Sequence, residues 1–482
     1  MKNRTKYNLF VQNCQYILND FFIISGYIYS QIVIFTYEGK MEKISSEELA
    51  AVVESYSTVV ETEIDRVATD SRQAGEGALF VAIRGENFDG HDFVAEALNQ
   101  GAELAMVERL VPNAPADRQL VVDDTLDAFG KIGAYNRSRF KGTVIGLTGS
   151  AGKTTTKEEI KFALSGFGSV YATAGNHNNH IGVPMSLCEM DMDADYAVIE
   201  MGMSAKGEIS RLTSYVKPDL ALVTNVYPMH IEFFDSFEGI AEAKAEIFEG
   251  LKQGGIAVIN EDTNFADILE KRAREHGARV IKFGRQNHYQ GKLELEQDGE
   301  AQLYNAWATL AVVEALGLDT DKAAAALKDF GALPGRGKSY RLKLPAGGCF
   351  TLIDDSYSGQ PEAMKIAIDG LSRMRCEGRK IAVLGKMAEL GDTSEARHKE
   401  IGEHLAAAAV EVVVGVCPEM KTMLAELRQD QEQYYFDDKE GLADFLVNNL
   451  LQNNDILLIK GARYSSKLYQ VTEILLKGLE KA

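Results

Sequence analysis

The residues best suited to chemistry in this chain form a glycine-rich segment, Thr148-Gly-Ser-Ala-Gly-Lys-Thr-Thr155. It follows an apolar run that ends at Leu147 and precedes residues that suit a helix. Glycines let backbone N–H groups approach phosphate oxygens, and a helix N-terminus adds a favourable dipole. Lys153 would then reach the β- and γ-phosphates, and the Thr154 hydroxyl would bind Mg²⁺. We therefore predict an ATP site that includes Gly149, Ser150, Ala151, Gly152, Lys153, Thr154 and Thr155. The alternative, a threonine-capped turn, does not explain why strand, loop, Lys-Thr and helix occur in this order.

Two further residues could complete a metal site near the phosphates. Glu200 ends the apolar run Ala197-Val-Ile-Glu, and His230 follows the strand-like segment Leu220–Thr224. The carboxyl ends of strands in open α/β sheets face the ligand crevice, so a carboxylate there can hold Mg²⁺. Alone, each residue is more often a hydrogen-bonded structural group. Because the phosphate loop implies a bound nucleotide with its metal ion, the metal-binding role is favoured here. We therefore expect Glu200 and His230 to lie near the metal.

Lys244 lies in a helix-forming segment, Ala241-Glu-Ala-Lys-Ala-Glu-Ile-Phe248. Its local pattern favours a solvated surface lysine. Nothing in the surrounding composition by itself requires a chemical role for it.

The rest of the chain has the alternation of strands and helices that would hold these residues at sheet edges. Its 482 residues suggest about three domains, since a domain has roughly 150 residues. The apolar segments of residues 41–140 are at 78–83, 93–98, 104–107 and 120–122. Those of residues 141–335 are strands at 143–147, 197–199, 220–223 and 256–259. Beyond a Pro-Gly linker at 333–337, strands of residues 336–482 occur at 350–353, 381–384, 412–414 and 456–459.

This alternation predicts an α/β fold of three domains. A central, P-loop-type, doubly wound parallel sheet would be flanked by a small N-terminal α/β domain and a C-terminal Rossmann-like α/β domain. Residues 1–40 differ from the rest, with aromatic and β-branched residues from Phe21 to Phe35. They contain no convincing signal cleavage site, and the apolar stretch from Phe21 to Phe35 is short for a membrane span. Because a serine that can cap a helix follows Met41, we expect 1–40 to be an extension without function.

Charge and cysteine usage narrow the class of protein. A formal net charge of −20 argues against a nucleic-acid-binding surface, because a phosphate backbone needs a basic stripe. A local phosphate cradle can still bind an anionic nucleotide. The 5 cysteines are scattered without a CxxC pair, which fits a reducing cytoplasm. We expect a cytoplasmic monomer without membrane insertion.

Several separate segments resemble the Mur ligase family, and within it the ligases that add D-alanyl-D-alanine to a UDP-linked cell-wall tripeptide. The short Gly-x-x-Gly-Lys-Thr loop, with Leu147 where general P-loops have glycine, is similar to that of the Mur ligase and folylpolyglutamate synthetase superfamily. The resemblance runs from about Met41 to the C-terminus. Its other segments are Thr69–Arg72, Leu79–Ala82, Gly85–His91, Thr173–Pro184, Val198–Gly202, His230–Glu232, Ala243–Phe248, Leu333–Arg336, Asp354–Tyr357, Glu389–Gly391 and Lys460–Gly461.

The resemblance implies an ATP-dependent, Mg²⁺-requiring, ADP-forming amide ligase of peptidoglycan precursor synthesis. Its substrates would be UDP-N-acetylmuramoyl-tripeptide, activated as an acyl phosphate, and D-alanyl-D-alanine. Lys153, His230 and Lys244 would be catalytic, and Lys244 would be carbamylated to supply an anionic metal ligand beside Thr154, Glu200 and His230. Further ATP contacts would come from Asn305, Arg336 and Asp355. Contacts with the UDP substrate would come from Ser71, Arg72, Asn178 and Asn179.

The chain departs from the family pattern at four points. Gln302 replaces an asparagine near adenine, although Asn305 is kept, and the strands before it are compressed into about 282–299. Ser358 and Gln360 replace the asparagines of Tyr-Asn-Ala-Asn-Pro, and Lys386 replaces the aspartate of Gly-Asp-Met. These changes predict a raised KM for ATP or D-alanyl-D-alanine with turnover preserved.

Two alternatives remain open at the level of sequence. The first is another ligase of the superfamily, such as the third-residue-adding Mur ligase, although its Asp-Asn-Pro-Arg motif is missing here. The UDP-sugar-type N-terminal segments argue against the folate enzyme. The second alternative is an ATP-binding homologue with impaired catalysis. ADP production that depends on both substrates would separate an enzyme from a binding protein.

Overall fold

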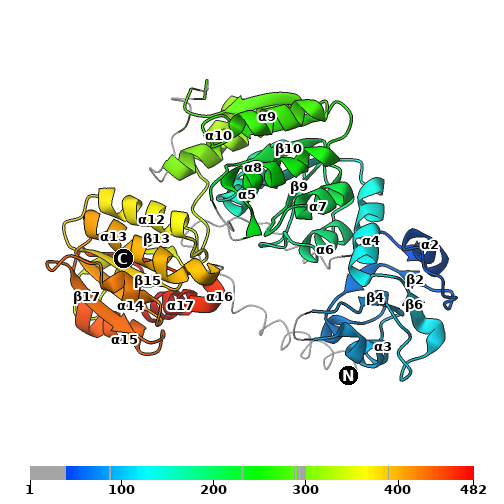
Figure 1. The fold of residues 1–482 in the computed structure, drawn as a ribbon, viewed down its shortest axis with the longest axis horizontal. Helices are drawn as coiled ribbons and strands as arrows, with labels where there is room; N and C mark the ends of the chain where they lie inside the picture. Colours follow the sequence, from blue (N-terminus) through cyan, green and yellow to red (C-terminus); the bar gives the residue numbers. More distant parts are fainter. Residues whose placement is uncertain are drawn as a thin grey trace, which may run out of the picture. The chain divides into compact units, whose positions relative to one another are not determined.

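The computed structural model describes residues 40–85, 88–228, 233–286, 288–289, 293, 300–388 and 390–482. Parts of the segments named above lie outside these described residues: 1–39, Glu86, Asn87, His230 with Ile231 and Glu232, Glu389, and much of 287–299. The described residues form three sheets of more than two strands, each with its own helices (Figure 1). The predicted α/β fold with three domains is therefore confirmed. Their exact boundaries remain a prediction.

The N-terminal sheet has four parallel strands in the order β3-β4-β5-β6. These are β3 (Arg66–Ala68), β4 (Ala78–Val81), β5 (Leu104–Val107) and β6 (Gln119–Val121). Before them, α2 (Ser46–Val52) lies between the paired short strands β1 (Ile44–Ser45) and β2 (Glu63–Ile64). Ser45 caps α2 by accepting a hydrogen bond from the Glu48 amide, as the serine before acidic residues predicts. The remaining helices are α3 (Val94–Asn99) and α4 (Thr125–Arg139).

The central sheet has six parallel strands in the order β12-β11-β10-β7-β9-β8. Its strands are β7 (Thr143–Thr148), β8 (Val170–Ala172), β9 (Tyr196–Glu200), β10 (Leu220–Val223), β11 (Ile256–Asn260) and β12 (Arg279–Phe283). Alternate residues along these strands face two separate cores. One face is covered by α6 (Gly182–Cys188), α7 (Glu208–Val216), α8 (Phe237–Ala245) and α9 (Ala266–Glu275). The other is covered by α5 (Lys153–Leu164), α10 (Glu300–Ala315) and α11 (Thr320–Leu327).

The C-terminal sheet has the order β13-β14-β18-β15-β16-β17, and only β13 is antiparallel to its neighbour. Its strands are β13 (Lys338–Lys343), β14 (Cys349–Asp355), β15 (Lys380–Gly385), β16 (Val412–Val416), β17 (Glu432–Phe436) and β18 (Ile456–Lys460). Its helices are α12 (Pro361–Arg373), α13 (Ser394–Ala407), α14 (Met420–Leu424), α15 (Leu442–Phe445), α16 (Arg463–Ser466) and α17 (Tyr469–Gly478).

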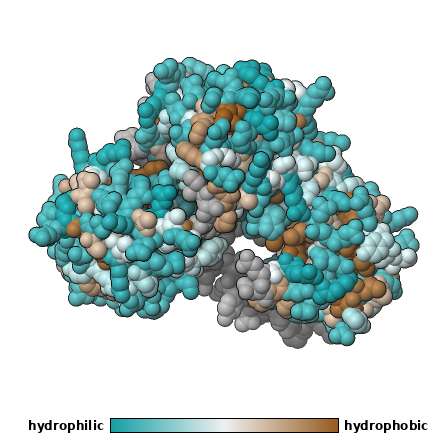
Figure 2. Space-filling view, in the orientation of Figure 1, coloured by the Kyte–Doolittle hydropathy of each residue, from teal (hydrophilic) through white to brown (hydrophobic). Residues whose placement is uncertain are grey.

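The surface agrees with the ordinary composition of the chain. Hydrophilic side chains cover most of the face drawn in Figure 2. Among the described residues, none of the helices has the length and hydropathy needed to cross a bilayer.

Candidate active site

The phosphate loop joins β7 to α5 and has the geometry that a phosphate cradle needs. Gly152 has a left-handed φ of 77° and directly precedes the first residue of α5, Lys153. A Cβ atom at Gly149 would lie 1.9 Å from the Thr224 hydroxyl oxygen, so only glycine fits there. The loop therefore passes close to the neighbouring strand and presents its backbone at a helix N-terminus, where an anion is stabilised.

Residues after β10 hold this loop in place, because β10 is the direct neighbour of β7. The Ala151 amide donates to the Asn225 side-chain oxygen (2.8 Å), and the Thr224 hydroxyl donates to the Ala151 carbonyl (2.8 Å). The Tyr227 amide donates to the Ser150 hydroxyl oxygen (2.9 Å). Sequence reasoning did not assign Thr224 or Asn225 to the site. Their position at the carboxyl end of an apolar strand was the available signal.

Lys153 lies against the loop that it belongs to. The residue is half-buried, and its ammonium donates to the Gly149 carbonyl at 2.8 Å. Burial lowers the pKa of Lys153, the carboxylate of Glu200 raises it, and the guanidinium of Arg336 lowers it further. The lysine is therefore positioned to bring a positive charge to phosphates on the loop.

Thr154 and Glu200, two expected metal ligands, are in contact. The Thr154 hydroxyl donates to Glu200 Oε1 at 3.3 Å, and Arg336 Nη2 donates to the Thr154 oxygen at 3.0 Å. Glu200 is buried, Asn178 donates to its Oε1 at 2.7 Å, and its Oε2 accepts no hydrogen bond from the described residues. A buried carboxylate oxygen without a hydrogen bond beside a hydroxyl fits a hard cation such as Mg²⁺. Among the described residues, no cluster of three His, Cys, Asp or Glu side chains is found.

Lys244 is not the solvated lysine that its local pattern favours, because only 3% of it is exposed. Lys244 lies in the last turn of α8, a helix that packs against α7 and α9. Burial holds the pKa of Lys244 well below its usual value, and the positive charge of Lys153 lowers it further. A lysine with a lowered pKa is neutral more often, and the neutral amine is the form that reacts with CO₂ to give a carbamate. His230, the remaining expected ligand, lies outside the described residues.

Asn305, Arg336 and Asp355, the other expected ATP contacts, lie on three different elements. The side-chain oxygen of Asn305 accepts from the Thr156 hydroxyl at 3.2 Å, close to the phosphate loop. Arg336 reaches Thr154 from the segment between α11 and β13. Asp355, at the end of β14, accepts from Lys460 at 2.7 Å.

The expected UDP-substrate residues are not joined by a direct contact in the described ranges. Ser71 and Arg72 follow β3, where Arg72 Nε donates to Asp70 at 2.9 Å. Asn178 contacts Glu200, whereas Asn179 accepts from the Gly182 amide at 2.8 Å near the start of α6. The structure thus groups Asn178 with the phosphate site.

Lys157 is a site residue that sequence reasoning missed. Its side chain is fully buried, and its ammonium donates to the carbonyls of Thr173 and Gly175, both at 2.6 Å. The same nitrogen lies 3.8 Å from Glu200 Oε2. The available signal was its spacing of four residues from Lys153, which places both lysines on one side of α5. Lys157 thereby connects the phosphate helix to Glu200 and to the segment that carries Asn178.

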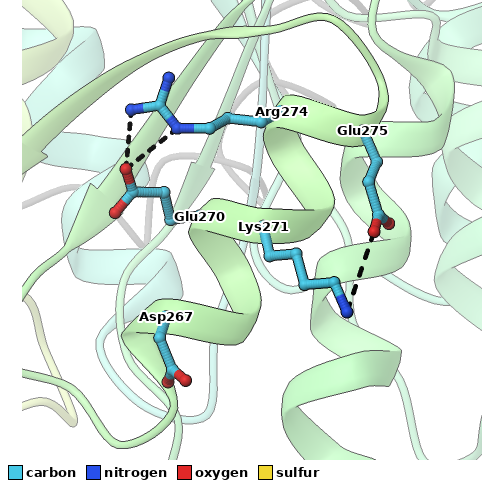
Figure 3. A pocket seen from close by; sticks show the side chains of 5 residues that line it. All are labelled: Asp267, Glu270, Lys271, Arg274 and Glu275. Carbon is cyan, nitrogen blue, oxygen red and sulfur yellow. Dashed lines mark hydrogen bonds and ion pairs between the residues drawn. The ribbon is translucent and has the colours of Figure 1, made fainter.

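A shallow surface depression on α9 does not belong to this site. It is lined by Asp267, Glu270, Lys271, Arg274 and Glu275 (Figure 3). Arg274 and Glu270 pair at 2.7 Å across one helical turn, as do Lys271 and Glu275 at 4.0 Å. These are exposed ion pairs of a solvated helix face.

Three family profiles match consecutive parts of the chain. They are "Mur ligase family, catalytic domain" over residues 63–135, "Mur ligase middle domain" over 147–313, and "Mur ligase, glutamate ligase domain" over 341–463. The UDP-N-acetylmuramoyl-tripeptide–D-alanyl-D-alanine ligase of Escherichia coli (strain K12) is 36% identical, over 83% of this chain and 91% of that protein.

Two crystal structures are similar over nearly their whole length. MurF from Acinetobacter baumannii is 30% identical, with a TM-score of 0.81, over 91% of this chain and 99% of that one. MurF from Thermotoga maritima in complex with ADP is 32% identical, with a TM-score of 0.73, over 86% of this chain and 97% of that one.

Proposed function

Because this chain belongs to the Mur ligase family, we propose that it joins D-alanyl-D-alanine to UDP-N-acetylmuramoyl-tripeptide in peptidoglycan precursor synthesis. The reaction consumes ATP and forms ADP and phosphate. The contact of Glu200 with Thr154 beside the Mur-type phosphate loop carries the proposal, because it combines a phosphate cradle with a carboxylate for Mg²⁺. The choice of substrates rests on the D-alanyl-D-alanine ligase of Escherichia coli, which this chain matches over most of its length.

In the proposed reaction, the terminal carboxylate of the tripeptide attacks the γ-phosphorus of ATP, and ADP leaves. The amine of D-alanyl-D-alanine, having lost its proton, then attacks the acyl phosphate, and phosphate leaves the tetrahedral intermediate. The loop amides and Lys153 offset the negative charge on the phosphates, while Thr154, Glu200 and a carbamate on Lys244 would hold Mg²⁺. The ion would supply further charge neutralisation at the phosphates.

Arg336 is proposed to act on the same phosphates. Its guanidinium lies at Thr154, and its Cζ stacks 4.1 Å from the centre of the Tyr357 ring. A planar guanidinium binds phosphate oxygens through two parallel hydrogen bonds, so ATP would draw Arg336 from the threonine hydroxyl to the phosphate.

Two of the residues that depart from the family pattern, Lys386 and Gln360, have partners in the structure. Lys386 Nζ contacts Glu419 Oε1 at 2.5 Å, so its reversed charge is neutralised within the C-terminal domain. The Gln360 amide donates to the Ala388 carbonyl at 3.3 Å. Since these groups find partners near the expected acceptor loop, we propose that turnover is retained and that the KM for ATP or D-alanyl-D-alanine is raised.

The proposed function is tested by measuring ADP release with ATP, Mg²⁺ and UDP-N-acetylmuramoyl-tripeptide. Release should require D-alanyl-D-alanine, and mass spectrometry should detect the UDP-linked pentapeptide. Activity with UDP-dipeptide and diaminopimelate or lysine instead would identify a third-residue-adding ligase. Absence of turnover at saturating substrates would support a homologue with impaired catalysis.

We also propose that the protein is a cytoplasmic monomer. The four cysteines among the described residues are free, which suits a reducing compartment. Size-exclusion chromatography with light scattering checks the monomer, and a mass of two chains would contradict it.

A further inference from the structure

Arg463 lies at the edge of the C-terminal sheet where several strand ends meet. The neighbouring strands β14, β18 and β15 are parallel and end at Asp355, Lys460 and Gly385. Arg463 follows β18 and begins α16. Ligands of open α/β sheets bind beyond the carboxyl ends of the strands, so Arg463 lies where a substrate is expected.

Other cations at this edge already have anionic partners. Lys460 pairs with Asp355 at 2.7 Å, and Lys386 pairs with Glu419 at 2.5 Å. Among the residues that the structure describes, no carboxylate lies within ion-pair distance of the Arg463 guanidinium, and its side chain donates no hydrogen bond to them. Arg463 is therefore the cation of this group that remains available for an anionic ligand.

Two aromatic rings hold Arg463 in position. Its Cζ lies 4.1 Å from the ring centre of Tyr469 and 5.6 Å from that of Tyr357. Stacking orients the plane of a guanidinium but leaves its N–H groups, which point outward in that plane, free to donate. The half-buried side chain thus presents an oriented fork of donors.

Tyr357 connects Arg463 to the phosphate site. Tyr357 also stacks on Arg336, whose guanidinium donates to Thr154. The backbone is joined as well, since the Arg463 amide donates to the Tyr357 carbonyl at 3.2 Å, and the Tyr357 amide donates to the Gly335 carbonyl at 3.0 Å. A ligand on Arg463 would lie one aromatic ring away from the arginine at the phosphate loop.

We propose that Arg463 binds the carboxylate of the dipeptide acceptor and thereby directs its amine toward the acyl phosphate. This inference rests on the proposed function. A carboxylate matches the planar fork of arginine through two parallel hydrogen bonds. It is also the permanent charge by which a free dipeptide differs from its amide.

The test compares D-alanyl-D-alanine with D-alanyl-D-alaninamide as acceptors, using wild type, Arg463→Met and Arg463→Lys. Wild type should have a lower KM for the dipeptide than for its amide. Arg463→Met should raise the KM for the dipeptide about ten- to hundredfold, the effect of losing a charged hydrogen-bonded pair. It should leave the KM for ATP and the KM for the amide nearly unchanged. Arg463→Lys, which keeps the charge without the fork, should lie between.

The matched control is Arg373→Met on α12, where an exposed arginine has a weak ion pair with Asp369 at 3.8 Å. It should not change either acceptor KM. The proposal is overturned if Arg463→Met raises the KM for dipeptide and amide equally, because the residue is then only structural, or if it changes neither. Thermal denaturation identifies a variant that fails to fold, and Arg463→Lys then decides by the same comparison. A wild-type protein that releases no ADP with these substrates would instead refute the proposed function.

Discussion

At the scale of a single residue, substitution of Lys153 would test the proposed phosphate site. Its ammonium lies on the loop carbonyl of Gly149, where it can move to the β- and γ-phosphates. We expect Lys153→Ala to abolish ligation, because losing this charge removes several kcal/mol of transition-state stabilisation. Turnover is measured by ADP release, and circular dichroism should show an unchanged fold. Near-normal turnover in the variant would remove this loop from the proposed site.

Lys244 tests whether burial produces a carbamate. Its lowered pKa makes the neutral amine accessible, and the carbamate would replace a cation near Mg²⁺ by an anion. We expect Lys244→Ala to lose activity and to regain part of it with added short-chain carboxylates. Carbon-13 NMR after incubation with labelled bicarbonate should show a carbamate signal in wild type and not in the variant. A wild-type protein without that signal would exclude the modification.

At the scale of an element, helix α5 carries Lys157, which connects the phosphate loop to Glu200. Lys157 anchors two carbonyls and lies near Glu200, so Lys157→Met leaves buried acceptors without their donor. We expect the Mg²⁺ concentration for half-maximal binding of fluorescent ADP to rise about tenfold, since such a loss costs about 1–3 kcal/mol. Lys161→Met, at an exposed position of the same helix, is the control. An unchanged Mg²⁺ dependence in Lys157→Met would show that the lysine does not position Glu200.

The same helix predicts a pH dependence of stability. Glu159 is buried against α10, where the Thr309 hydroxyl contacts it at 3.5 Å, and burial raises its pKa from 4.5 to about 8. The folded state therefore binds this proton more tightly than the unfolded state. Its contribution to stability is full below the unfolded pKa and is lost as the pH rises through about 8, at about 1.4 kcal/mol per pH unit.

Glu159→Gln should remove this dependence. The variant should have a higher Tm than wild type above the folded pKa of about 8, and the advantage should vanish toward the unfolded value of 4.5. Glu473→Gln, at an exposed position on α17, should leave the pH profile as in wild type. Parallel Tm profiles of Glu159→Gln and wild type would contradict a buried proton at Glu159.

At the scale of the whole molecule, we propose that the residues needed for ligation begin near Met41. Met41 is buried, and its amide donates to the Asp65 carbonyl at 2.7 Å, so it belongs to the N-terminal domain. We expect deletion of residues 1–40 to leave kcat and KM unchanged, because the motifs and the three profile matches all follow this segment. Kinetics and fractionation of the full chain and the truncated form check it. A large loss of soluble activity would refute the prediction.

The strands that are buried on both faces could be predicted from the amino-acid sequence, and so could the phosphate loop. Apolar runs bounded by turn residues predicted β5 and β10 with the bounds observed. Edge strands such as β12 and β17 were missed, because half-exposed strands carry polar residues that interrupt the apolar run. The family resemblance supplied the roles proposed for Lys244 and Arg336, which local sequence pattern could not.

Which of these residues lie in contact depends on the order of the strands in the folded sheet. Asn225 and Glu200 reach the phosphate loop because β10 and β9 are the two neighbours of β7. Strand order depends on how the chain connects one strand to the next, and hydrophobic periodicity does not indicate those connections. The burial of Lys157 and Lys244 likewise depends on the elements that cover their helices. The local sequence around a helical lysine does not show whether its side chain faces water or a second helix.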